Sequence, residues 1–403
     1  MKLDMLNFDT SKNLSVFLKA FSLYTVSVPR KYQTEVIMDK IFVSPSRYIQ
    51  GKDLVSHAGQ YMEHFGQKVL VLADEFVQKI AANQLIDNLN ESFDITKVTF
   101  NGECSTKEIN RVSELAQDHG VDFVLGMGAG KALDTAKAVA DRNNVPIVVF
   151  PTLASTDAPT SGLSVVYTEA GEFEQYLFYK KNPDLVLMDT AIVAQAPARM
   201  MASGISDALA TLVEARAVKQ KNGNTMSGGK ATIAGFAIAE KCEEVLFDYA
   251  LLAYEANKEK IVTPALEAVV EANTLLSGLG FEDSGLAAAH AIHNGFTAVE
   301  GDIHHLSHGE KVAYGTLTQL VLENKTIDEI NRYLELYIQL DLPVTLEQMH
   351  LEDKSFDELL EIGKSATKEG ETMSNMPFDV TPEDVAQALR AVDAFARLYM
   401  SKK

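Results

Sequence analysis

Residues 122–140 read DFVLGMGAGKALDTAKAVA and carry the clearest structural signal in the chain. The segment starts with an apolar run, continues through Gly126, Gly128 and Gly130, and ends in apolar residues at helical spacing. Such a strand, glycine turn and helix can hold a diphosphate on the backbone N–H groups at the helix start. A tight turn without a ligand is the alternative, since the spacing matches neither the usual Rossmann fingerprint nor a Walker A loop.

The alternation of apolar runs with helical segments extends on both sides of this segment. Further apolar, β-branched runs are KVLVLA at 68–73, DITKVTF at 94–100, PIVVF at 146–150 and DLVLM at 184–188. Runs that are apolar on both faces predict parallel strands covered by helices. From about Ala198 onward these runs vanish, and helical patterns follow at 204–218, 228–254, 264–277, 309–323, 325–340 and 381–400. The sequence therefore predicts an α/β dinucleotide-binding domain with a parallel sheet over residues 38–198 and an all-α domain over residues 199–403.

Composition limits the classes of partner. The 403 residues are 46% hydrophobic and 23% charged, which is typical of a globular protein with a buried core. A formal net charge of -20 repels phosphate backbones, so nucleic acid is not an expected partner. Two cysteines, Cys104 and Cys242, build neither a disulfide framework nor a cysteine-based zinc module. No apolar run approaches the roughly 20 residues of a membrane span, so no membrane partner is expected either.

The first 37 residues have no clear period and are predicted to be an N-terminal extension. A secretory signal fits poorly, because Lys19 interrupts the apolar stretch at 13–28 and no small-residue cleavage site follows. A transit peptide also fits poorly, since the segment has one arginine, Arg30, and carries Asp4 and Asp9. We therefore expect a cytoplasmic protein, with organellar import as the alternative left open by this extension.

Five of the nine histidines fall within nineteen residues: His290, His293, His304, His305 and His308. Neutral imidazole is the commonest metal ligand, so the cluster predicts a divalent metal site with an open position for a substrate oxygen. His290 and His293 are spaced i, i+3 and His304 and His308 are spaced i, i+4, so the spacing leaves the ligands undecided.

Two carboxylates have both a functional and a structural interpretation. Asp207 lies in the apolar stretch GISDALATLVEA, where it can complete a His-His-Asp metal site or cap a helix. Asp74 follows the run at 68–73, where a carboxylate can bind the ribose 2′-OH of NAD and repel the 2′-phosphate of NADP, or again cap a helix. The hydroxyl-rich segment at 151–167, PTLASTDAPTSGLSVVY, is interpreted as a binding loop, with simple turn chemistry as the alternative.

Together these segments resemble the glycerol dehydrogenases, a branch of the iron-containing alcohol dehydrogenase and dehydroquinate synthase superfamily. The most specific matches are GAGKALDTAKAVA, PTLASTDAP, GEFEQYLFYKKNPDLVLMDT, APARMMASGISDALAT and GLAAAHAIHNGFTAVEGDIHHLSHGEKVAYGTL. The resemblance runs from about Met38 to the C-terminus and implies the dehydroquinate synthase-like fold, with metal and substrate between an α/β domain and a helical domain. It implies zinc ligands at Asp207, His290 and His308.

The resemblance also implies an activity and a set of contacts. The iron-using enzymes carry an additional His at the position of Thr211, so zinc is favoured over iron. Asp157 is expected to meet a hydroxyl of the polyol substrate, together with the metal ligands. The NAD contacts implied are Asp74, Gly130, Lys131, Thr152, Ser155, Ser161, Leu163 and Tyr167. The expected reaction is the reversible NAD-linked oxidation of glycerol to dihydroxyacetone, by a homo-oligomer that in this family is often an octamer.

Some features depart from the family pattern and leave alternatives open. The usual FESGG is here FEDSG at 281–285, and the usual GMGDALATWFEA is GISDALATLVEA, so the preferred diol is not fixed. The alternative function is a dehydrogenase of the same superfamily for another alcohol or a polyol phosphate, although the quoted loops offer few basic residues besides Lys131. A zinc hydrolase, in which the glycine turn is only structural, and a catalytically inactive binding protein are the more distant alternatives.

Overall fold

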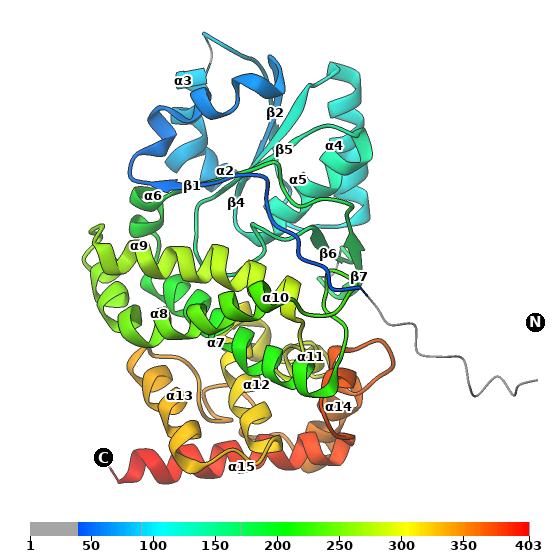
Figure 1. Cartoon of the computed structure of the whole chain (residues 1–403), viewed down its shortest axis with the longest axis vertical. Coiled ribbons are helices and arrows are strands. Elements are labelled where there is room, and N and C mark those ends of the chain that lie inside the picture. Colours follow the sequence, from blue (N-terminus) through cyan, green and yellow to red (C-terminus); the bar gives the residue numbers. More distant parts are fainter. Residues whose placement is uncertain (1–38, 90, 170, 403) are drawn as a thin grey trace, which may run out of the picture. The chain divides into compact units, whose positions relative to one another are not determined.

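The computed structural model describes residues 39–89, 91–169 and 171–402 (Figure 1). The predicted N-terminal extension, residues 1–37, lies outside these ranges. Within them, no helix has the length and apolar character needed to cross a membrane.

Six parallel strands form one sheet in the order β1-β8-β5-β4-β2-β3. Their bounds are β1 Tyr48–Gly51, β2 Lys68–Ala73, β3 Asp94–Thr99, β4 Phe123–Gly128, β5 Ile147–Pro151 and β8 Leu185–Asp189. Alternate residues of β2 enter different cores: Leu70 and Leu72 pack with the helices at 106–119 and 130–143, whereas Val69 and Val71 pack with the helix at 83–89. Both faces are therefore covered, as the apolar runs predict.

The helices of this part are α2 Glu75–Val77, the π-helical turn η5 Gln78–Ala82, α3 Asn83–Leu89, α4 Thr106–His119, α5 Gly130–Asn143 and α6 Thr190–Gln195. Short 3-10 turns lie at η2 Leu54–Ser56, η3 Ala58–Tyr61 and η4 Glu63–Phe65. An antiparallel hairpin, β6 Leu163–Tyr167 and β7 Phe173–Phe178, forms a second, two-stranded sheet. The sequence patterns predict neither β1 nor this hairpin as strands.

The chain after β8 and α6 is helical, and its first long helix starts at Ala198. The bounds are α7 Ala198–Lys221, α8 Ile233–Lys258, α9 Pro264–Glu271, the π-helical turn η6 Ala272–Leu276, α10 Ser277–Ser284, α11 Ala288–Gly295, α12 His308–Leu322, α13 Ile327–Gln339, α14 Phe356–Ala366 and α15 Pro382–Ser401, with 3-10 turns η7 Phe296–Ala298, η8 Asp302–His305 and η9 Thr372–Asn375. Thr381 caps α15 and Pro382 is its first residue, a position where the missing N–H of proline would have no partner within the helix. The predicted fold class, a parallel α/β part followed by helices, is confirmed.

One continuous helical stretch, α9–η6–α10, contacts the loop that follows β5. Asn273 Nδ2 donates a hydrogen bond to Ala154 O at 3.0 Å, and Thr160 Oγ1 donates to Thr274 O at 3.1 Å. Further along the helix, Glu282 Oε1 accepts a 2.8 Å hydrogen bond from Gly162 N. These contacts attach the loop at 154–162 to the helical part and so fix its position beside α7.

Candidate metal and cofactor site

Asp207, His290 and His308 come together from three different helices. Asp207 lies inside α7, His290 lies on α11, and His308 is the first residue of α12. One potential ligand atom from each residue lies within 4.8 Å of the others. Asp207 Oδ1 is 3.0 Å from Nε2 of His308 and 3.3 Å from Nε2 of His290.

The donor set fits a divalent cation. Asp207 is fully buried, and neither of its carboxylate oxygens has a hydrogen bond of acceptable geometry. An unpartnered buried carboxylate is costly unless a cation compensates it. Tetrahedral coordination with bonds of about 2.0–2.2 Å places neighbouring ligand atoms about 3.4 Å apart, close to the two N···O distances in this site. Three N and O ligands leave the fourth position open for a substrate oxygen.

The helix-cap interpretation of Asp207 is wrong. Pro197 precedes the first residue of α7, so Asp207 is more than two turns inside the helix and cannot cap it. Burial opposes ionisation of Asp207, but the neighbouring His308 and His290 outweigh it and hold the pKa of Asp207 below its ordinary value. The carboxylate is therefore ionised, which is the form that can bind a cation.

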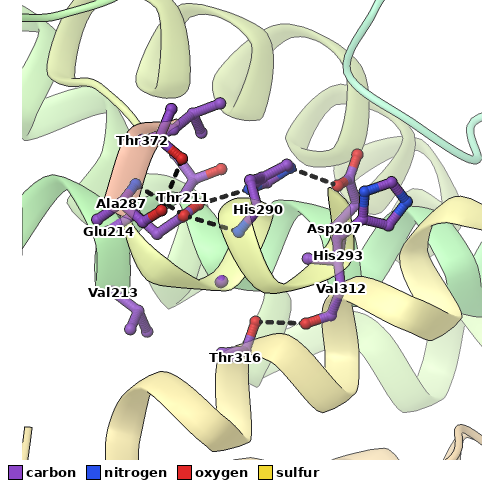
Figure 2. Close-up of polar contacts among 12 residues, drawn as sticks. Asp207, Thr211, Val213, Glu214, Ala287, His290, His293, Val312, Thr316 and Thr372 are labelled. Carbon is purple, nitrogen blue, oxygen red and sulfur yellow. Dashed lines mark hydrogen bonds and ion pairs between the residues drawn. The ribbon is translucent and has the colours of Figure 1, made fainter. Parts of the chain in front are cut away.

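Glu214 fixes the orientation of the His290 ring. Its Oε2 lies 2.6 Å from Nδ1 of His290, and its Oε1 accepts hydrogen bonds from the backbone N–H groups of His290 and Ala287 at 3.0 and 2.8 Å. Figure 2 shows Glu214 and Asp207 on opposite sides of the ring. Because an ionised carboxylate only accepts, Nδ1 donates a proton to Glu214, and Nε2 is the ring nitrogen directed at Asp207.

The remaining histidines do not join this group. His293 is buried beside His308, with ring centroids 4.2 Å apart, and burial followed by the charge of His308 lowers its pKa. The i, i+4 spacing of His304 and His308 predicts that they share one face of a helix, and this prediction is wrong. His304 lies in the turn η8 and contacts Val299 O through Nε2, whereas Ser307 is the extended N-cap of α12. His305 is exposed and 3.6 Å from Asp302.

Asp157 lies in the loop after β5, close enough to the metal-ligand group for its charge to interact with Asp207 and His290. Its Oδ2 accepts a 2.8 Å hydrogen bond from the Ser277 hydroxyl. Burial, and then the negative charge of Asp207, raise the pKa of Asp157 to about 8. A carboxyl group in this position can exchange hydrogen bonds with a substrate hydroxyl.

The glycine turn joins β4 to α5 and brings their backbones close. A Cβ on Gly126 would lie 2.4 Å from Cβ of Ala136, so the helix packs where only glycine fits. Gly128 has φ of 142°, a conformation that favours glycine. Gly130 is the first residue of α5, and its N-cap Ala129 has no side chain to satisfy the first N–H groups. This helix end suits an anion such as a diphosphate.

A cleft of about 620 Å³ opens at the carboxyl ends of β2, β5 and β8. Asp74 and Thr152 both line it, and so do the exposed side chains of Phe76 and Ile80. Asp74 also caps α2, because its Oδ1 accepts a 2.8 Å hydrogen bond from Val77 N. The cap interpretation of Asp74 is therefore confirmed, and the same carboxylate still faces the cleft where open α/β sheets bind ligands.

Lys131, the second residue of α5, lies over the ring of Tyr167. The Lys131 Nζ is 5.0 Å from the centroid of the Tyr167 ring and 2.6 Å from Oε2 of Glu103. Lys131 is exposed, so its ion pair with Glu103 is weak and an anionic ligand can compete for the ammonium group. The two predicted NAD contacts thus share one surface.

Three further residues predicted to contact NAD lie in the loop and its hairpin. Ser155 is half-buried, and its carbonyl accepts a hydrogen bond from Ser203. The side chains of Ser161 and Leu163 are buried, and the Ser161 hydroxyl donates to Ala158 O. The Nζ of buried Lys137 donates to the carbonyls of residues 158, 161 and 163 and pairs with Asp134 at 2.9 Å. Lys137 therefore holds the loop in place from beneath.

Sequence reasoning missed Glu214, Ser277, Glu103 and Lys137. For Glu214 a signal was present: Asp207, Thr211 and Glu214 are spaced i, i+4 and i+7 within the largely apolar segment 204–215, so they form a polar stripe on one face. Ser277 had no comparable signal, because its contacts depend on the π-helical turn just before it.

Comparison with known proteins agrees with this arrangement. Residues 45–190 match the sequence profile of the family described as iron-containing alcohol dehydrogenase. The chain is 48% identical to a glycerol dehydrogenase from Citrobacter freundii, over 91% of this chain and 100% of that protein. It is 46% identical to a glycolaldehyde reductase from Halobacterium salinarum, over 89% and 99% of the two chains.

Among solved structures, the glycerol dehydrogenase of Schizosaccharomyces pombe superposes with a TM-score of 0.88 at 42% identity, covering 91% of this chain and 93% of that one. Identity of this level over nearly the full length identifies the family. The chain belongs to the glycerol dehydrogenases of the iron-containing alcohol dehydrogenase family.

Proposed function

We propose that the chain is an NAD-dependent glycerol dehydrogenase, which oxidises glycerol reversibly to dihydroxyacetone at a zinc ion held by Asp207, His290 and His308. The observation that carries most weight is the buried Asp207 carboxylate, which has no hydrogen bond of acceptable geometry and lies beside two imidazole Nε2 atoms. The relatives named glycerol dehydrogenase supply the substrate and the reaction.

Zinc is proposed because the site offers one carboxylate and two imidazoles. Thr211, one turn after Asp207, directs its hydroxyl to Ser277, so this position adds no fourth protein ligand. A bound zinc ion would supply Lewis acidity, which lowers the pKa of an alcohol that occupies the open position. Glu214 would keep the proton of His290 on Nδ1 and so leave Nε2 free to ligate.

NAD would occupy the cleft at the strand ends and supply the hydride acceptor. We assign the ribose to Asp74, the diphosphate to Gly130 and Lys131, and the nicotinamide to the loop and hairpin. The residues proposed there are Thr152, Ser155, Ser161, Leu163 and Tyr167. Asp74 favours NAD over NADP, because a carboxylate repels a 2′-phosphate.

Asp157 would accept a hydrogen bond from a second hydroxyl of the polyol and so orient the reacting carbon. A neutral polyol suits this site better than a polyol phosphate. Lys131 is assigned to the diphosphate of NAD, and Arg199 is paired with Glu310 through Nε at 2.6 Å. Few cations are therefore available to bind a phosphate group.

Reduction of glycolaldehyde is the second candidate, favoured by the 46% identical relative that carries this name. Both reactions use the same zinc and NAD sites and differ only in the substrate. We also propose a cytoplasmic homo-oligomer, with an octamer as the first assembly to look for, and retain the division between domains at residues 198 and 199.

The test is a substrate panel with the zinc-loaded protein. Formation of NADH is followed with glycerol, 1,2-propanediol and glycerol phosphate, and oxidation of NADH is followed with dihydroxyacetone and glycolaldehyde. We expect turnover of glycerol and 1,2-propanediol with NAD and loss of both in Asp207→Asn. A rate with glycerol phosphate alone would overturn the proposal, and a rate with glycolaldehyde far above that with dihydroxyacetone would favour the second candidate.

A further inference from the structure

Thr211 departs from the usual behaviour of a buried threonine in a helix. The hydroxyls of Thr274, Thr316 and Thr318 each donate to the carbonyl four residues earlier in their own helix, at 2.8, 2.9 and 2.7 Å. Within the described residues, Thr211 Oγ1 instead has its hydrogen bond with the Ser277 hydroxyl, at 2.9 Å. Thr211 is 1% exposed, so this bond satisfies a hydroxyl that water does not reach.

Ser277 also forms a hydrogen bond with Asp157, which lies in the loop after β5. It is fully buried at the start of α10, directly after the π-helical turn η6. Its hydroxyl donates to Oδ2 of Asp157 at 2.8 Å. A π-helical turn adds a residue to the helix and is frequent at functional sites, because it redirects the side chains that follow it. Here the redirected side chain spans the gap between α10 and the loop after β5.

The number of protons fixes the direction of this chain of bonds. A serine hydroxyl has one proton, and Ser277 gives it to Asp157 when that carboxyl group is ionised. The proton between Thr211 and Ser277 must therefore come from Thr211. The bonds engage Oδ2 of Asp157 only, so Oδ1 remains the oxygen that can turn to a substrate.

We propose that Thr211 and Ser277 are positioning residues that hold Asp157 toward the hydroxyl next to the reacting carbinol and thereby set the preference for vicinal diols over simple alcohols. This inference rests on the proposed function, in which Asp157 meets a substrate hydroxyl. Neither residue touches the substrate, and their effect passes through the orientation of one carboxylate.

The test compares 1,2-propanediol with propan-2-ol, which share a secondary carbinol and differ by one hydroxyl. The diol preference is the ratio of the two kcat/KM values. Ser277→Ala should lower it about tenfold and Thr211→Val about threefold, the sizes expected for a lost hydrogen bond and for its indirect support. The loss should arise from a higher KM for the diol, whereas zinc content and the Kd for NADH stay as in the unmodified enzyme.

Two variants separate positioning from folding. Thr211→Val keeps the methyl group that packs against Gly280, and Thr211→Ser keeps the hydroxyl and should restore the preference. Thr318→Val removes an equally buried hydroxyl that bonds only within its own helix, and it should retain the preference. An equal loss with both substrates, or no loss in Ser277→Ala, would overturn the inference.

Asp157→Asn separates the substrate contact of Asp157 from the support that Ser277 gives to this carboxylate. If it loses the diol preference while Ser277→Ala keeps it, Asp157 meets the substrate without this support and only the positioning role fails. If Asp157→Asn keeps the preference, the substrate role of Asp157 fails and takes the positioning role with it. An unmodified enzyme that oxidises neither alcohol with NAD would contradict the proposed function itself.

Discussion

Replacing Glu214 with glutamine should weaken zinc binding without touching a ligand. In the structure, one Glu214 oxygen accepts two backbone N–H groups and the other accepts the Nδ1 proton of His290. A glutamine side chain has one acceptor oxygen, so it can accept either the backbone N–H groups or the Nδ1 proton of His290, but not both. If its oxygen serves the backbone, its amide N–H₂ faces Nδ1 and draws the ring proton to Nε2, the nitrogen that must ligate.

The magnitude follows from the role of such outer partners of metal-bound histidines. Loss of the partner typically lowers metal affinity 10- to 100-fold, which corresponds to about 1.4–2.7 kcal/mol of binding free energy. Glu214 is fully buried and its contact with Nδ1 is short, so we expect a value near the upper end.

The assay is a competition for zinc with a chromophoric chelator, which yields the Kd of each variant. Glu243→Gln is the matched control, because Glu243 is also buried but pairs with Arg216 and Arg332 rather than with a histidine. Its Kd for zinc should remain at the unmodified value. If Glu214→Gln bound zinc as tightly as the unmodified protein, the proposed ring orientation would be refuted.

Three other variants test separate parts of the account. Asp74→Asn keeps the cap on Val77 N but removes the charge, so the ratio of kcat/KM with NADP to that with NAD should rise about tenfold, and an unchanged ratio would contradict the ribose assignment. Burial raises the pKa of Asp283 to about 7, so between about pH 4 and 7 the unfolded chain releases a proton that the folded chain keeps, and stability falls as pH rises. Asp283→Asn should remove a cost on the order of 2–4 kcal/mol at pH 8, seen as a higher Tm than the unmodified protein at pH 8 but not at pH 4; a lower Tm at pH 8 would contradict this. Lys137→Met leaves Asp134 buried without its partner and should cost about 3–5 kcal/mol, and an unchanged melting temperature would show that the loop does not depend on this pair.

The sheet was predictable because its strands are buried on both faces. The runs at 68–73 and 146–150 can be predicted as strands without knowledge of their neighbours, since their apolar character alone indicates that helices cover both faces. Strands β1 and β7 are less buried and contain polar residues, as in YIQG and FEQYLF, so periodicity does not distinguish them from loops. Their strand conformation depends on pairing with β8 and β6.

The site depends on contacts between distant segments, which spacing cannot supply. His290 and His308 belong to different helices, so their separation in sequence has no helical meaning, and the i, i+4 pattern of His304 and His308 was misleading. The combination of His290 and His308 with Asp207 was predicted from the resemblance to the family. The roles of Ser277 and Lys137 follow only from the folded loop, because their partners are backbone carbonyls and a carboxylate more than twenty residues away.

The most direct test of the central claim is the rate of NADH formation from glycerol before and after metal removal. Protein stripped by a chelator should lose its activity and regain it on addition of about one zinc ion per chain, whereas Asp207→Asn treated in the same way should regain none. Full turnover by a preparation shown by elemental analysis to hold no metal would contradict the account.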